Sequence, residues 1–184
     1  AVHLPGLDID RYSLPLPDPE GEGFLGDRAS QTAFRSLIDR AREHHLDGRD
    51  PFGRTPSRQL GKDEIDLVLV GGNPDAAHAL HLAVEEYARQ LCYVVQMFLA
   101  QADWAGVERI VIGGGFPEHE AGALAMRRAM CLLELADTGV DLLPLRHDPD
   151  EGGLLGWSPL LPAAARRYDA FLAVDVGGTK LRCG

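Results

Sequence analysis

Residues 108–116, Glu-Arg-Ile-Val-Ile-Gly-Gly-Gly-Phe, decide the fold class of this chain. Residues 108–112 read as a buried strand, and the three glycines at 113–115 end it. Residues from about 118 to 136 then read as a helix. A strand, a glycine turn and a helix in this order are typical of layered α/β proteins.

Further strands and helices alternate after this segment. Residues 140–145 and 171–176 read as two more strands, and residues 153–167 read as a helical region of small residues that Pro159 and Pro162 interrupt. This alternation predicts an α/β fold.

Two helices are predicted before the glycine segment. The spacing of apolar residues predicts the first over 29–46. Asn73 followed by Pro74 is typical of a helix start, and an apolar stripe then extends to about residue 101. Beyond Leu91 nearly every side chain is apolar, so this part is expected to be buried on all sides. The stripe predicts core, with a homodimer interface as the alternative.

Three other segments are ambiguous or irregular. Residues 65–70 suit a short buried strand or a short helix. Glycine and proline interrupt residues 1–26, which are expected to be irregular or to form at most one extended segment, with the acidic run at 18–22 solvated. Residues 47–61 read as an arginine-containing loop, either solvated or an anion site.

Composition narrows the classes of function. The chain has 184 residues and a net charge of −10, which argues against binding nucleic acid or anionic lipid through bulk charge. Backbone N–H groups in glycine turns can still bind phosphate. The three cysteines lie far apart, and no apolar run reaches the length of a membrane span, so a reduced, cytoplasmic protein without a membrane segment is expected.

A second glycine segment is Val-Asp-Val-Gly-Gly-Thr-Lys at 174–180. A predicted strand delivers Asp175 and then meets two glycines, where backbone N–H groups can approach a phosphate beside a hydroxyl and an ammonium. An aspartate at a strand end suits Mg²⁺, as phosphoryl transfer requires. The pattern favours a nucleotide phosphate site, with an ordinary strand and hairpin turn as the alternative.

Together these segments resemble the ROK family of sugar kinases and related repressors, within the actin, hexokinase and Hsp70 superfamily. The likeness covers residues 29–184 and favours a helix over a strand at 65–70. The similar segments are VDVGGTK at 174–180, IVIGGG at 110–115, ASQTA at 29–33, the helix that begins near residue 71 and GGLLGWSPLL from residue 152.

The resemblance implies a ribonuclease H-like lobe of the actin-like ATPase type. In the family the phosphate motif opens the chain, whereas here it follows the segment that resembles the closing helix, so the lobe is expected to be circularly permuted or truncated. The implied division is an irregular segment at 1–28, a C-terminal-type nucleotide-binding lobe at 29–168, and the first strand and phosphate turn of the other lobe at 169–184.

The implied activity is that of an ATP-dependent hexose kinase, which transfers the γ-phosphoryl group to a sugar hydroxyl. The implied cofactors are ATP and Mg²⁺, and the implied partners are the nucleotide and the sugar. Asp175 is the implied metal-side carboxylate. The implied nucleotide-binding residues are Gly113, Gly114, Gly115, Gly177, Gly178, Thr179 and Lys180.

Several family features are missing from the sequence. The family's sugar base lies in an Asn-Asp segment that only Asn73-Pro74-Asp75 resembles, and Asp75 is explained by a helix start. Gly26 stands where the family has a sugar-contacting glutamate. We therefore expect these residues alone to bind nucleotide without turnover. The alternatives are a non-catalytic sugar-sensing regulator or degenerate nucleotide-binding member of the family, and a structural domain whose glycine turns are only turns.

Overall fold

The computed structural model describes residues 2–4, 7–9, 15–43, 50, 52–71, 73–176 and 181–183. The chain divides into two compact units, one of residues 15–144 and one of residues 1–14 with 145–184. These two units are defined by how the chain packs. The boundaries predicted at residues 28 and 168 come from sequence motifs, and they stay predictions.

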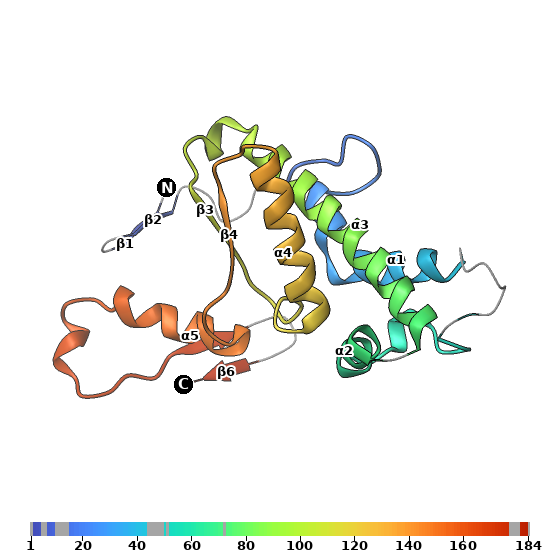
Figure 1. The fold of residues 1–184 in the computed structure, drawn as a ribbon. Helices are drawn as coiled ribbons and strands as arrows, with labels where there is room; N and C mark the ends of the chain where they lie inside the picture. The colour runs from blue at the N-terminus through green and yellow to red at the C-terminus, as the bar shows by residue number, and fades with distance from the viewer. Residues whose placement is uncertain are drawn as a thin grey trace. The chain divides into compact units, whose positions relative to one another are not determined.

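The unit of residues 15–144 is α/β in the general sense. Strands β3 and β4 pair in parallel, and α4 connects them. Figure 1 shows the strand pair on one side of α4, with α1, α2 and α3 on the other. The elements of this unit are η1 (Leu25–Ala29), α1 (Gln31–Glu43), η2 (Ser57–Gln59), α2 (Lys62–Gly71), α3 (Pro74–Leu99), η3 (Ala102–Trp104), β3 (Arg109–Ile112), α4 (Glu120–Leu135) and β4 (Asp141–Pro144).

Helix α3 is the centre of the core. Its start is as predicted, because the Asn73 side chain accepts hydrogen bonds from the N–H groups of Asp75 and Ala76. Leu80 and Val84 on its inner face are fully buried together with Leu142 of β4. Helices α1, α2 and α4 pack against α3, and α4 carries the core on to β4.

Helix α2 confirms the helical alternative for residues 65–70. Within this short helix Ile65 is buried, whereas Leu67 and Val70 are exposed. A central parallel strand would bury this apolar run on both faces, whereas the helix buries only part of it.

Two burial predictions are wrong. Strand β3 is not fully buried, because the core covers one face only: Ile110 and Ile112 pack against it, and Val111 is 54% exposed. The second half of α3 is not buried on all sides either, because Gln96 is exposed and Phe98 is only half-buried.

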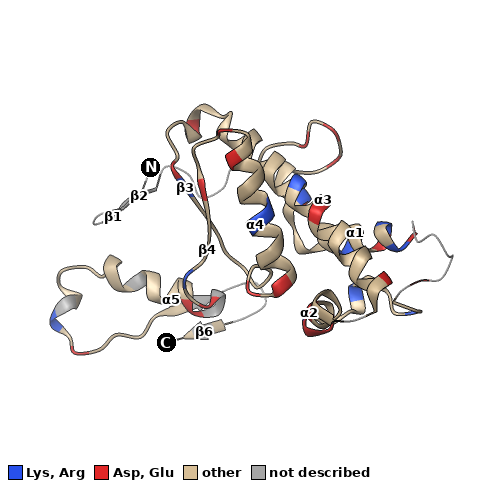
Figure 2. Ribbon diagram, viewed as in Figure 1, with Lys and Arg blue, Asp and Glu red and all other residues tan. Residues whose placement is uncertain are grey.

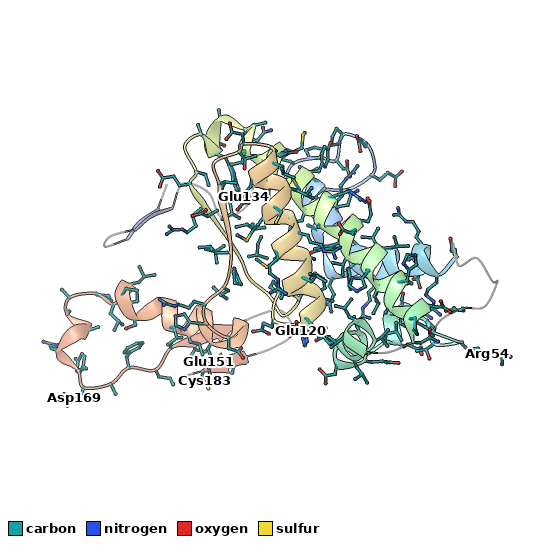
Figure 3. All side chains as sticks on the ribbon, viewed as in Figure 1. Arg54, Glu120, Glu134, Glu151, Asp169 and Cys183 are labelled. Atoms are coloured by element: carbon teal, nitrogen blue, oxygen red, sulfur yellow. The ribbon has the colours of Figure 1, made fainter. Side chains whose placement is uncertain are left out.

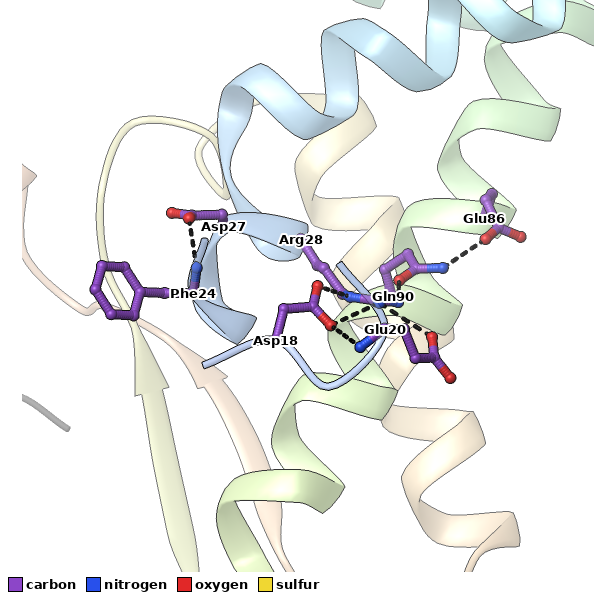
Figure 4. Close-up of polar contacts among 7 residues, drawn as sticks. All are labelled: Asp18, Glu20, Phe24, Asp27, Arg28, Glu86 and Gln90. Atoms are coloured by element: carbon purple, nitrogen blue, oxygen red, sulfur yellow. Dashed lines mark hydrogen bonds and ion pairs between the residues drawn. The ribbon is translucent and has the colours of Figure 1, made fainter. Parts of the chain in front are cut away.

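The acidic segment at 18–22 is not simply solvated. Figure 4 shows Arg28 of η1 paired with it, with Nε 2.5 Å from Asp18 Oδ2 and Nη2 3.0 Å from Glu20 Oε2. The same guanidinium donates to Gln90 Oε1 on α3 at 3.2 Å. Hydrogen bonds from Arg28 and from the Glu20 backbone N–H lower the pKa of Asp18, whose side chain is only 8% exposed. Glu20 itself remains exposed, as expected.

In the described part of the loop at 47–61, the contacts favour a solvated loop over an anion site. Arg42 of α1 hydrogen-bonds the Asp50 carboxylate at 2.9 Å and the Thr55 carbonyl at 2.7 Å. This arginine therefore ties the loop to α1, while Arg54 and Arg58 are exposed.

The second unit is built from short elements. Antiparallel strands β1 (Val2–Leu4) and β2 (Leu7–Ile9) correct the expectation of an irregular N-terminus. The predicted helical region at 153–167 overlaps α5 (Pro149–Leu160), which begins four residues earlier, and includes η4 (Ala165–Arg167). Pro159 lies inside α5 and does not interrupt it, contrary to the prediction. Strand β5 (Val174–Val176) is shorter than the predicted strand at 171–176 and pairs antiparallel with β6 (Leu181–Cys183).

The distribution of charged residues and the hydropathy of the helices are as the composition leads one to expect. Figure 2 shows basic residues spread over separate elements of the described chain, interspersed with acidic ones. Among the described residues, no helix combines the length and the apolar character that a membrane span needs.

Candidate functional site

The glycine turn after β3, residues 113–119, is the part of the predicted site that the structure describes in full. Gly113 and Gly114 are exposed and Gly115 is half-buried, so the backbone of the first two faces solvent. Gly114 has a φ of 89°, which L side chains rarely adopt, and open space surrounds its Cα. The turn leaves the carboxyl end of a parallel strand, where open α/β sheets bind their ligands.

A fourth glycine, which sequence reasoning missed, lets this turn fold back on α4. A Cβ on Gly122 would lie 1.9 Å from the Phe116 carbonyl oxygen and 3.1 Å from Pro117 Cα. The signal in the sequence is a glycine in the first turn of an otherwise strong helix, which often marks close backbone approach. Figure 3 labels Glu120, the first residue of α4, two positions before this glycine.

Phe116 anchors the turn to the helical core. Its ring centroid lies 4.8 Å from that of Phe34 on α1 and 4.9 Å from that of Tyr87 on α3. Burial raises the pKa of Tyr87 to about 12, and its hydroxyl donates to the Ala29 carbonyl at 2.6 Å. The exposed glycines thus lie next to a residue that packs in a cluster of three aromatic rings.

Helix α2 contacts the turn from a second side, through two residues that the sequence did not indicate. Lys62 Nζ donates to the Gly115 carbonyl at 3.3 Å. Asp66 Oδ1 accepts from the Ala121 N–H at 3.1 Å, and its Oδ2 lies 3.4 Å from His119 Nδ1. No local pattern marks the two hydrogen-bonded pairs, because their members are 53 and 55 residues apart.

A small hollow lies where α1, α2 and the turn meet. Its volume is about 10 Å³, the room of a single water molecule, so an adenine ring does not fit inside it. Arg35 lines it, donates to the Ser57 carbonyl at 2.9 Å and has its pKa lowered by burial. A nucleotide at this turn would therefore rest on the exposed glycine backbone.

The second predicted motif belongs to the other unit. Asp175 lies in β5, opposite Arg182 in the antiparallel register with β6. Gly177, Gly178, Thr179 and Lys180 lie outside the described residues. An aspartate is a chemically suitable ligand for Mg²⁺, which prefers oxygen donors. The role of Asp175 and those of its four neighbours stay predictions.

Residues considered for the sugar end have structural explanations in this fold. The Asp75 N–H binds the Asn73 side chain in the first turn of α3, and the Asp75 side chain is exposed. Gly26 is exposed within η1. Within the described parts of the chain, no three His, Cys, Asp or Glu side chains are grouped so as to hold a metal ion.

Comparisons of the chain with models of known protein families, with curated proteins and with solved structures found no significant match.

Proposed function

We propose that this chain is part of an ATP-dependent hexose kinase of the ROK type and supplies its adenosine-side lobe and first phosphate turn. The observation that carries the proposal is the exposed glycine backbone at 113–114, at the carboxyl end of β3 and anchored to the core through Phe116. The proposed fold of the lobe is ribonuclease H-like, permuted or truncated, and the proposed location is the cytoplasm.

The proposed chemistry is in-line transfer of the γ-phosphoryl group to a sugar hydroxyl. Gly113, Gly114 and Gly115 would lie against the adenosine. The phosphates would be bound by the backbone of Gly177 and Gly178 together with Thr179 and Lys180. Asp175 would hold Mg²⁺, which when bound neutralises charge on the transferred group.

The sugar hydroxyl must also lose its proton, and Asp75 is poorly placed to accept it. Asp75 lies in the first turn of α3, where the helix dipole stabilises its exposed carboxylate. We therefore expect these residues alone to bind Mg·ATP without sugar-dependent turnover. The same observation, with the exposed Gly26, favours a second candidate, a nucleotide-binding member of the family that lacks kinase activity.

Titration calorimetry with Mg·ATP on matched glycine variants tests the proposal. Gly114 and Gly106 both have left-handed φ values, 89° and 80°, and at both positions an added Cβ would have no heavy atom within 4 Å. Alanine at either position is expected to cost a similar backbone strain of about 1–2 kcal/mol. Only Gly114→Ala should weaken ATP binding, by about tenfold, the loss of roughly one hydrogen bond.

The outcomes separate the candidates. If the unaltered chain does not bind ATP at millimolar concentration, the glycine turns have only a structural role. If Gly114→Ala and Gly106→Ala weaken ATP binding equally, the turn at 113–115 does not take part in binding. ATP consumption that depends on added hexose would overturn the expectation of binding without turnover, whereas its absence with intact binding is the expected result and fits both candidates.

A further inference from the structure

Helix α2 holds both ends of the segment that carries the glycine turn into α4. Lys62 and Asp66 are four residues apart and so share one face of the helix. Lys62 reaches the Gly115 carbonyl at the start of this segment, and Asp66 reaches the Ala121 N–H at its end. Two side chains of one rigid element therefore span the segment from 115 to 121.

Asp66 also replaces a helix cap that α4 does not supply itself. The residue at the N-cap position, His119, makes no capping hydrogen bond with its side chain. The first N–H groups of a helix need acceptors from outside the helix, and the Asp66 carboxylate serves the second of them at 3.1 Å. The position of α4 relative to the turn thus depends on a contact from α2.

Gly115 is matched to this contact. A Cβ at this position would lie 2.8 Å from Lys62 Nζ, so a side chain here would require the end of the lysine to shift from its place beside the carbonyl. The glycine that ends the exposed backbone and the lysine that holds it are therefore parts of one arrangement.

We infer that Lys62 and Asp66 are positioning residues for the nucleotide, which fix the Gly113–Gly115 backbone from behind without touching the ligand themselves. This inference rests on the proposed function, because it assigns the two residues a role only if ATP binds at the turn. Helix α2 would then contribute to nucleotide binding through these two residues.

Four variants test the inference. Asp66→Leu removes the acceptor for the Ala121 N–H, whereas Asp66→Asn keeps an oxygen that can accept it. Lys62→Met removes the donor to Gly115 and keeps most of the stem. The control is Asp63→Asn, which alters an exposed carboxylate in the first turn of the same helix.

Three measurements are made on each variant: Mg·ATP affinity by calorimetry, amide hydrogen exchange of residues 114–121, and urea unfolding. Asp66→Leu should accelerate exchange at Ala121 and weaken ATP binding about tenfold, the effect of one lost charge-assisted hydrogen bond. Lys62→Met should weaken binding severalfold. Asp66→Asn should stay near the unaltered protein, and Asp63→Asn should match it.

The results distinguish this inference from the proposed function. If the unaltered chain does not bind ATP, both fall together. If it binds and Asp66→Leu exchanges faster at Ala121 yet binds equally well, α2 is only structural and the inference falls alone. If Asp66→Leu does not fold, Lys62→Met decides: weakened binding with an unchanged unfolding midpoint supports the inference, and unchanged binding overturns it.

Discussion

Replacing Gly122 by alanine tests whether the glycine turn and α4 are as tightly packed as the structure indicates. The new methyl group would lie 1.9 Å from the Phe116 carbonyl oxygen and 2.6 Å from its carbonyl carbon. Real Cβ atoms essentially never approach closer than 3.0 Å, so the carbonyl must retreat by about 1.1 Å. Because the obstacle is backbone, no change of rotamer can relieve the clash.

Two effects of opposite sign set the magnitude. Alanine has the higher helix propensity, which favours the variant by about 1 kcal/mol. Overpacking typically costs roughly 1–3 kcal/mol, and a backbone clash this close belongs at the upper end of that range. We therefore expect Gly122→Ala to lower the free energy of unfolding by about 2 kcal/mol.

Urea unfolding followed by far-ultraviolet circular dichroism measures this difference. Gly71→Ala is the matched control, because Gly71 is an exposed helical glycine of the same unit with nothing within 4 Å of an added Cβ. The control carries the propensity effect without the clash, so it should leave the free energy of unfolding unchanged or raise it by up to about 1 kcal/mol. Equal or greater stability of Gly122→Ala would refute the close approach of Phe116, and with it the reason for a glycine at this position.

Two further predictions concern single side chains. The lowered pKa of Asp18 means that its pairing with Arg28 contributes stability above the ordinary value of 3.8 and loses it as pH falls through the folded-state pKa. Asp18→Asn should therefore be less stable than the unaltered chain at pH 7, and the gap should shrink towards pH 2; a gap independent of pH would contradict the pairing. For the thiols, burial raises the pKa of Cys92, whereas Cys131 and Cys183 are exposed. A thiol reagent at pH 8 should modify the two exposed cysteines quickly and Cys92 only on unfolding, and equal rates would contradict its burial.

Local features of the structure were predictable where the physics is local. Asn73 and Pro74 begin α3 as expected, since a cap and a fixed φ depend on neighbours in the chain. The strand at 109–112, its glycine turn and α4 were predictable for the same reason. These elements carry the turn that we propose as the nucleotide site.

Burial and long-range contacts were not predictable in this way. The exposure of Val111 depends on what covers the second face of the strand pair, which no local pattern encodes. The pairing of Arg28 with Asp18 depends on how η1 lies beside the segment before it. The sequence did not indicate Lys62 and Asp66, because a lysine and an aspartate on a short helix are ordinary surface residues until the partner turn is known.

The chain and its proposed ligand, ATP, are both negatively charged, so the glycine turn must bind ATP despite electrostatic repulsion. A net charge of −10 opposes the approach of ATP at long range, but screening limits that repulsion to about 8 Å at physiological ionic strength. Within that distance, Lys62 contacts the turn and Arg35 lines the hollow behind it. These two cations lie near the turn together with the carboxylate of Asp66, which also lines the hollow. The magnesium complex of ATP has a lower charge than free ATP, which weakens the repulsion further. For this reason we expect the affinity for Mg·ATP, measured by the same calorimetry, to exceed that for ATP alone.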